Sequence, residues 1–140
     1  MNTMPTFLKD YYTTSEADNI CISAEQGSAF AKQIAQDFNP LHDSNSKRFC
    51  VPGDLLFSLA LSRYGLSERM AFKYTGMVGK DTELVFPQDA ETSFEIKDIK
   101  DKAYLTIERQ GESKKNLELI ESFTRAYVAF SGHSFPHVLV

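Results

Sequence analysis

The chain has 140 residues, of which 42% are hydrophobic and 24% are charged, and its formal net charge is −4. This composition is typical of one globular domain and excludes a disordered or fibrous protein. The negative charge argues against nucleic acid or an anionic membrane surface as a partner. The longest apolar stretch, residues 55–61, is too short to span a membrane.

The two cysteines, Cys21 and Cys50, are far apart and have no spacing typical of a metal site. Residues 1–10 lack the charged and apolar regions of a signal peptide. We therefore expect a cytoplasmic protein with free thiols, without a bound metal ion or cofactor.

The first part of the chain predicts a strand followed by a helix. Residues 19–23 alternate apolar and polar side chains, which favours a half-buried strand. Ser28 suits a helix N-cap, and large apolar residues then recur at every fourth position through residues 30–38. Pro40 disfavours helical backbone at the residue before it, so this helix should end near Phe38.

The stretch from residue 52 to residue 65 predicts a second helix that is apolar on nearly all sides. Asp54 suits its positive start, and Gly65 suits its C-terminal end. A helix without a polar face is normally buried within a fold.

After Gly65 the hydrophobic period changes to two, which is typical of strands. The predicted strands cover residues 70–78, 83–86, 91–98 and 103–109, and residues 98–102 and 110–115 are expected to be polar connections. Because the chain lacks alternating strand and helix units, a doubly wound sheet is excluded. The sequence predicts an α+β fold in which an antiparallel sheet wraps around one central apolar helix.

The turn after the first helix carries candidate catalytic groups. Asp37 would lie at the negative C-terminal end of that helix, which would make its carboxylate more basic. His42 titrates near neutrality and could fold back across Pro40 toward Asp37. Together the two groups could share one water for acid-base chemistry. The alternative is an ordinary turn that ends a helix, because Asn and Asp side chains commonly bond the local backbone there.

A resemblance favours the catalytic reading. Ala29-Phe30-Ala31 followed by Asp37-Phe38-Asn39-Pro40-Leu41-His42 is similar to the motif of the MaoC-like hydratases, the (R)-specific enoyl-CoA hydratases with a hot dog fold. Val51-Pro52-Gly53 before the apolar helix and Leu84-Val85-Phe86-Pro87 with Asp89 also resemble that family, over about residues 19–110.

The resemblance implies a site and a substrate class. Asp37 and His42 would hold the catalytic water, Asn39 would brace them, and the backbone N–H of Gly53 would polarise the carbonyl of an enoyl thioester. A free N–H at the start of a helix and the absence of a side chain suit Gly53 for that role. The sequence departs from the family at Ala35-Gln36, at Pro52, and in the short segment between His42 and Gly53.

Lys47, Arg48 and Leu56 are predicted to bind the substrate, with the two basic residues meeting the phosphates of coenzyme A. The partner implied is an acyl-CoA or acyl-ACP thioester, and the resemblance implies a homodimer. Two other functions are considered: a hot dog module that binds an acyl chain or a partner without turnover, and an acyl-CoA thioesterase that uses the same carboxylate and helix start.

The end of the chain repeats the outline of the motif region. Residues 127–137 repeat the outline of residues 30–42, and an offset of ninety-six places Pro136 on Pro40 and His133 on Asp37. Residues 117–120 are expected to form a strand before this repeat, as residues 20–22 do before the first copy.

We therefore expect residues 1–112 to form a hot dog unit and residues 113–140 to begin an incomplete second unit, a strand plus a helix. The chain also resembles an uncharacterised bacterial family with such a double layout. Coincidence between two helix-ending turns is the alternative explanation.

Overall fold

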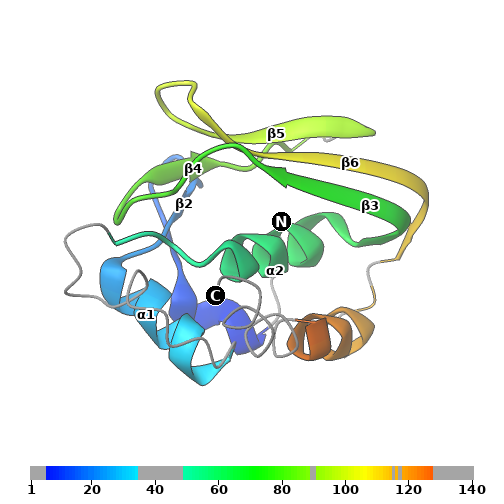
Figure 1. The fold of residues 1–140 in the computed structure, drawn as a ribbon, viewed down its shortest axis with the longest axis horizontal. Helices are drawn as coiled ribbons and strands as arrows, with labels where there is room; N and C mark the ends of the chain where they lie inside the picture. Colours follow the sequence, from blue (N-terminus) through cyan, green and yellow to red (C-terminus); the bar gives the residue numbers. More distant parts are fainter. Residues whose placement is uncertain (1–5, 35–48, 89–90, 115, 117, 128–140) are drawn as a thin grey trace, which may run out of the picture.

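The computed structural model describes residues 6–34, 49–88, 91–114, 116 and 118–127. Within these residues an antiparallel sheet of six strands forms one layer of the molecule (Figure 1). The strands are β1 (Thr13–Thr14), β2 (Ile20–Cys21), β3 (Leu66–Tyr74), β4 (Glu83–Val85), β5 (Ser93–Asp98) and β6 (Ala103–Lys114). Their order in the sheet is β1-β2-β4-β5-β6-β3, so β3 lies at one edge and pairs with β6.

The helices lie on one side of this sheet. They are the short 3-10 helix η1 (Thr6–Tyr11), α1 (Ala24–Gln33), α2 (Gly53–Tyr64) and a helix over residues 118–127. Helix α2 runs beneath the sheet, and α1, η1 and the 118–127 helix lie on the far side of α2 (Figure 1). The predicted α+β class, with a sheet that covers an apolar helix, is confirmed. No helix in the described part of the chain has the length and hydropathy to cross a membrane.

Helix α2 is buried on nearly all sides, as its sequence predicts. Nine of its twelve residues are buried, and Leu55, Leu59 and Ala60 are 0% exposed. These side chains join the main core with apolar residues of α1 and of strands β4 to β6. On another side of the helix, Phe57 and Leu61 form a smaller core with Ile120 of the 118–127 helix.

Helix α1 begins and ends earlier than predicted. Its N-cap is Ser23, whose hydroxyl accepts the backbone N–H of Gln26 while the Gln26 side chain accepts the N–H of Ser23. This reciprocal pair satisfies two N–H groups at the helix start, so the predicted cap at Ser28 is wrong. The helix ends at Gln33, with Ile34 as C-cap, and the predicted end near Phe38 is also wrong.

Strand β1 was not predicted, and the bounds of β3 and β6 differ from their predictions. Strand β3 spans Leu66–Tyr74 rather than residues 70–78, and β6 continues to Lys114 through residues expected to form a connection. Leu66 pairs with Lys114 at the far end, so β3 keeps β6 extended beyond the core. The pairing explains why a polar stretch containing Gly111 is nevertheless a strand: β3 supplies partners for its backbone hydrogen bonds.

Residues 118–120 open a helix, so the strand expected at residues 117–120 is wrong. Asn116 starts this helix, because its side-chain oxygen accepts the N–H of Leu119 at 3.1 Å and its carbonyl accepts the N–H of Ile120 at 2.9 Å. The repeat in residues 128–137 lies outside the described residues.

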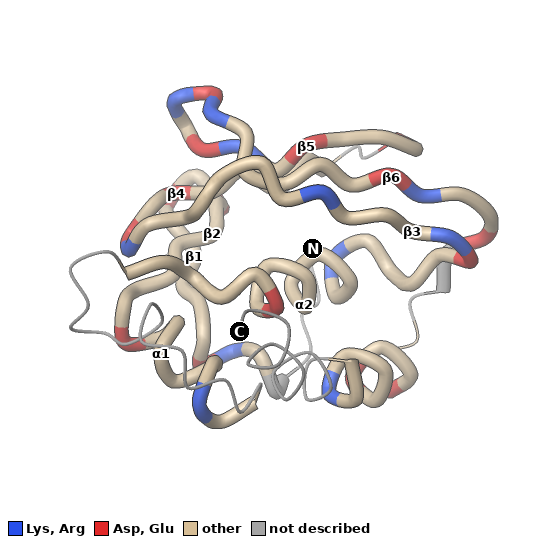
Figure 2. Tube along the Cα trace, in the orientation of Figure 1, with Lys and Arg blue, Asp and Glu red and all other residues tan. Residues whose placement is uncertain are grey.

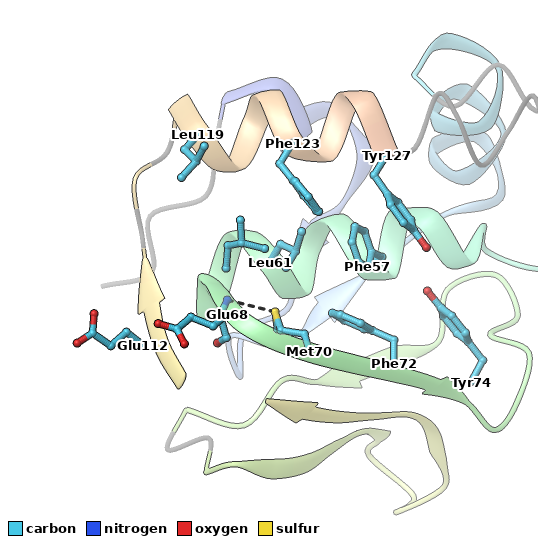
Figure 3. Close-up of a pocket in the computed structure, with 12 residues that line it drawn as sticks. Phe57, Leu61, Glu68, Met70, Phe72, Tyr74, Glu112, Leu119, Phe123 and Tyr127 are labelled. Atoms are coloured by element: carbon cyan, nitrogen blue, oxygen red, sulfur yellow. Dashed lines mark hydrogen bonds between the residues drawn. The ribbon is translucent and has the colours of Figure 1, made fainter. Parts of the chain in front are cut away.

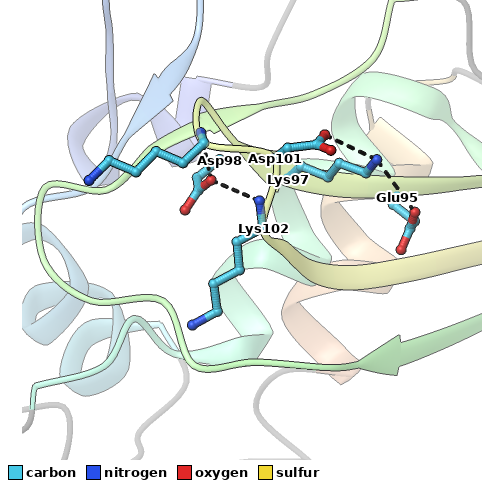
Figure 4. A network of polar contacts seen from close by, with 6 residues as sticks. Glu95, Lys97, Asp98, Asp101 and Lys102 are labelled. Atoms are coloured by element: carbon cyan, nitrogen blue, oxygen red, sulfur yellow. Dashed lines mark hydrogen bonds and ion pairs between the residues drawn. The ribbon is translucent and has the colours of Figure 1, made fainter.

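The turn between β5 and β6 is organised by one carboxylate (Figure 4). Asp98 accepts the backbone N–H groups of Lys100 and Lys102 through Oδ1, at 2.8 and 3.0 Å, and the Tyr104 hydroxyl through Oδ2 at 2.8 Å. The bond from Lys102, followed by that from Tyr104, lowers the pKa of Asp98 below its usual value.

The lowered pKa of Asp98 predicts a specific loss of stability in acid. Because the ionised form is favoured in the folded protein, its contribution is present above the unfolded pKa of about 3.9 and is lost as the pH falls through the folded pKa. We expect Asp98→Asn to unfold in urea with a shallower dependence on pH below about pH 4 than the wild-type protein. Tyr104→Phe should reduce the wild-type slope only in part, and equal slopes for all three proteins would contradict the prediction.

Candidate functional site

The N-terminus of α2 is placed beside the edge of the sheet. Pro52 is the N-cap, and its carbonyl accepts the N–H of Leu55 at 3.0 Å. Gly53 is therefore the first helical residue, where N–H groups have no partner within the helix. In the described part of the chain no acceptor is seen for the N–H of Gly53. This group and the positive end of the helix dipole are suited to an oxygen that gains negative charge.

Tyr74, the last residue of β3, connects this helix start to the sheet. Its hydroxyl donates to the carbonyl oxygen of Gly53 at 2.9 Å. A Cβ on Gly53 would lie 3.2 Å from the Tyr74 ring, so glycine permits the close approach. Desolvation, followed by the charges of Asp54 and Tyr127, raises the pKa of Tyr74 even though 47% of the residue is exposed. The hydroxyl therefore stays protonated and remains a donor.

This bond predicts a measurable contribution to stability. Tyr74→Phe removes the only donor to the Gly53 carbonyl from outside the helix that is seen in the described residues, and we expect the free energy of unfolding to fall by about 0.5–1 kcal/mol. Tyr127→Phe is the matched control, because Tyr127 is 45% exposed and its hydroxyl makes no hydrogen bond to a described residue. Equal losses for both variants, measured by urea unfolding, would contradict the role of Tyr74.

A groove runs from Tyr74 along β3, between this strand, α2 and the 118–127 helix (Figure 3). Its volume is about 650 Å³, which lies in the range of small-molecule sites. The lining is predominantly apolar and comprises Phe57, Leu61, Leu66, Ser67, Glu68, Met70, Phe72, Tyr74, Glu112, Leu119, Phe123 and Tyr127. We call this set the β3 groove.

Aromatic rings dominate the middle of the β3 groove and the end near Tyr74. Phe57 lies 4.5 Å from Tyr127 in a stacked arrangement and 4.8 Å from Phe72, measured between ring centroids. Leu119, Phe123 and Tyr127 are spaced four residues apart along their helix and are 40–45% exposed. An apolar stripe of this kind on the side of a groove is unusual for a surface that meets only water.

The opposite end of the β3 groove is acidic. Glu68 and Glu112 lie there, at the far end from Tyr74 (Figure 3). The Glu68 carboxylate lies over Gly111, where an added Cβ would meet its Oε2 at 2.6 Å, and the φ of 85° at Gly111 also favours glycine. None of the described lining residues is basic. Elsewhere, basic and acidic residues are interspersed over the described elements rather than collected on one face (Figure 2).

Five of the predicted site residues lie outside the described residues: Asp37, Asn39, His42, Lys47 and Arg48. Both flanks of their segment contact α1. The segment leaves from the end of α1 at Gln33, and the ring of Phe49 lies so close to Gly27 that an added Cβ would be 2.6 Å from its Cζ. Because α1 ends at Gln33, four residues before Asp37, its helix dipole gives no support for a more basic carboxylate at Asp37.

The other predicted residues belong to α2. Gly53 lies at the helix start, as expected. Leu56 is 2% exposed, belongs to the main core and does not line the β3 groove. In the described residues, no group of His, Cys, Asp and Glu is arranged to hold a metal ion.

The sequence interpretation missed the β3 groove. The spacing of Leu119, Phe123 and Tyr127 carries a helical signal, but the shorter alternation at residues 117–120 obscured it. No sequence pattern indicates that Tyr74 meets Gly53, because that contact depends on how β3 leaves the end of α2.

The family model that matches this chain is described as "Protein of unknown function (DUF3581)" and covers residues 6–140. Neither the curated proteins nor the solved structures contain a match to the chain.

Proposed function

The chain belongs to the family described as "Protein of unknown function (DUF3581)", and we propose that it is a cytoplasmic hot dog protein that adds water reversibly to a trans-2-enoyl thioester of coenzyme A or acyl carrier protein. The observation that carries this proposal is the junction at Tyr74. That residue lines an apolar groove and also contacts Gly53, the first residue of the buried helix. A thioester carbonyl at the helix start and an acyl chain in the groove could therefore be bound together.

In the proposed reaction Asp37 and His42 hold a water, and one of them removes its proton as the oxygen bonds to the β-carbon. The electrons of the double bond move onto the thioester oxygen, where the N–H of Gly53 stabilises the enolate. The α-carbon then receives a proton from the acid-base pair, and the product is a 3-hydroxyacyl thioester. Asn39 would brace the pair, while Lys47 and Arg48 would bind the phosphates of the carrier.

We also propose that two copies associate through β3. This strand is the edge of the sheet and nine residues long, whereas the opposite edge, β1, has two residues. The register shows which backbone groups of β3 point away from β6. The N–H of Arg109 in β6 donates to the carbonyl of Thr92, on the side of β6 away from β3. Arg109 is opposite Met70 of β3, so these two residues form a pair without hydrogen bonds between them, and the N–H and C=O of Met70 point away from β6. Unpaired backbone groups on a long edge favour pairing with another strand, and light scattering would measure the association.

The second candidate function is binding of an acyl thioester without turnover. It is favoured by the β3 groove itself, whose apolar lining requires no catalytic group to hold a chain.

An assay with crotonyl-CoA and a long-chain trans-2-enoyl-CoA tests the proposal. We expect the absorbance of the conjugated thioester to fall and a 3-hydroxyacyl-CoA to accumulate, with the reverse reaction from that product. Release of free thiol from either substrate would instead indicate a thioesterase. If folded protein turns over neither substrate but is stabilised thermally by both, the hydratase proposal is wrong and the binding function is favoured.

A further inference from the structure

The β3 groove has different chemistry at its two ends. At one end Tyr74 donates its single O–H hydrogen to the Gly53 carbonyl, so the backbone N–H groups at the start of α2 are the donors that can meet a polar or anionic head. At the other end Glu68 and Glu112 are exposed to solvent, and none of the described residues that line the groove beside them is basic. A ligand that lies along the groove therefore meets a donor end and an acidic end with apolar surface between them.

We propose that the β3 groove binds a long unbranched acyl chain and that Glu68 and Glu112 select against chains whose far end is a carboxylate. The assignment of the thioester end to α2 rests on the proposed function. The selection at the far end does not, because it follows from the charges at that end of the groove. The ligand class is thus a long monocarboxylic acyl chain, with a neutral or cationic far end.

The length of the groove fixes which chains can reach the acids. Tyr74 and Glu68 are six residues apart on β3, which corresponds to about 20 Å at roughly 3.3 Å per residue. With C–C bonds of about 1.52 Å and bond angles of about 111°, an extended alkyl chain advances about 1.25 Å per bond, so about sixteen bonds cover this distance. Chains of this length should bring their far end to Glu68 and Glu112, whereas short chains should end among the rings of Phe72 and Phe57.

The shape and composition of the groove favour an alkyl chain over a protein segment. The volume of about 650 Å³ is that of a small-molecule site, and most of the side chains that border it are aromatic rings and leucines, with one methionine. A docked amphipathic helix would instead require an open hydrophobic groove that accepts several anchors on one helix face. The negative charge at the acidic end repels a second carboxylate at the far end of a dicarboxylic chain, but it does not repel the methyl end of an alkyl chain.

The test is a titration calorimetry measurement of three saturated ligands with the full chain: hexadecanoic acid, hexadecanedioic acid and ω-aminohexadecanoic acid. They share one head group and differ only at the far end. We expect the dicarboxylic acid to bind about three- to tenfold more weakly than hexadecanoic acid at neutral pH and low salt, because exposed charges interact modestly. The difference should shrink at high salt, and it should vanish for the matching pair of six-carbon ligands, which cannot reach the acids.

Variants on the surface of the groove identify the site. Glu68→Gln combined with Glu112→Gln should bring the dicarboxylic acid to the affinity of hexadecanoic acid, while Glu108→Gln, an exposed glutamate of β6 outside the β3 groove, should leave the ratio unchanged. Phe123→Ala should weaken all three ligands about equally. Phe123 is 40% exposed, so this variant should fold.

Several outcomes would overturn the inference: no binding of any long ligand, binding that Phe123→Ala leaves unchanged, or equal affinity for the two acids in the wild-type protein. Saturated ligands cannot be hydrated, so these results are independent of turnover. Selective binding without hydration would contradict the proposed reaction but support the groove as an acyl-chain site. Hydration without selection at the far end would contradict only the inference about Glu68 and Glu112.

Discussion

Hydration of an enoyl-CoA by the Asp37→Asn variant is expected to be slower than hydration by the wild-type protein by a factor of about 100 to 10,000. Asparagine keeps the size and one oxygen of the side chain but cannot accept a proton from water at neutral pH. His42→Ala should cause a loss in the same range. The measurement is kcat/KM from the fall in absorbance of the conjugated thioester.

The two variants should also be combined. If Asp37 and His42 act on one water as a unit, the double variant will be little slower than either single variant, because each substitution already removes the shared step. Asp10→Asn, an exposed carboxylate of η1, controls for a change in net charge. Rates within about twofold of wild type for both single variants would show that the reaction, if present, uses other residues.

The central helix could be predicted because local sequence determines it. Apolar side chains cover nearly its whole circumference, and Gly65 ends it with a φ of 87°, so burial follows from composition alone. The four longer strands were expected for a similar reason, since a period of two has few structural alternatives. These features do not depend on which distant residues come together.

The errors occur where two local signals compete. Ser23 with Gln26 is a capping box, whereas the apolar residues at 30, 34 and 38 in the sequence favour a helix that starts later, at Ser28. The sequence of the end of β6 predicts a connection because its residues are polar. It is a strand because β3 supplies backbone partners as far as Lys114, and nothing in residues 110–114 themselves encodes that pairing.

The candidate site shows the same division. Gly53 could be placed at a helix start from sequence, because Pro52 and Asp54 flank it and an apolar run follows. The β3 groove could not be predicted from sequence, because it is formed by α2, β3 and a helix that lies more than forty residues after β3 in the chain. Its apolar stripe on residues 119–127 is interpretable only once those residues are known to be helical.

Replacing Leu59 by alanine is expected to lower the free energy of unfolding by about 2–5 kcal/mol, a large part of the 5–15 kcal/mol typical of a single domain. Leu59 is 0% exposed in the middle of α2, and its side chain belongs to the main core. The loss has two parts: less apolar surface is transferred out of water on folding, and a cavity is left beneath the sheet. Urea unfolding measures it, and an unchanged m-value would show that the unfolding transition itself is the same.

Leu119→Ala is the matched control, because it makes the same chemical change on the 118–127 helix at a residue that is 43% exposed. Its free energy of unfolding should stay within about 0.5 kcal/mol of wild type, as is usual for surface substitutions. The two leucines therefore separate two roles of apolar surface in this protein: Leu59 stabilises the fold and Leu119 borders the β3 groove. If both substitutions cost the same, α2 is not the centre of the core.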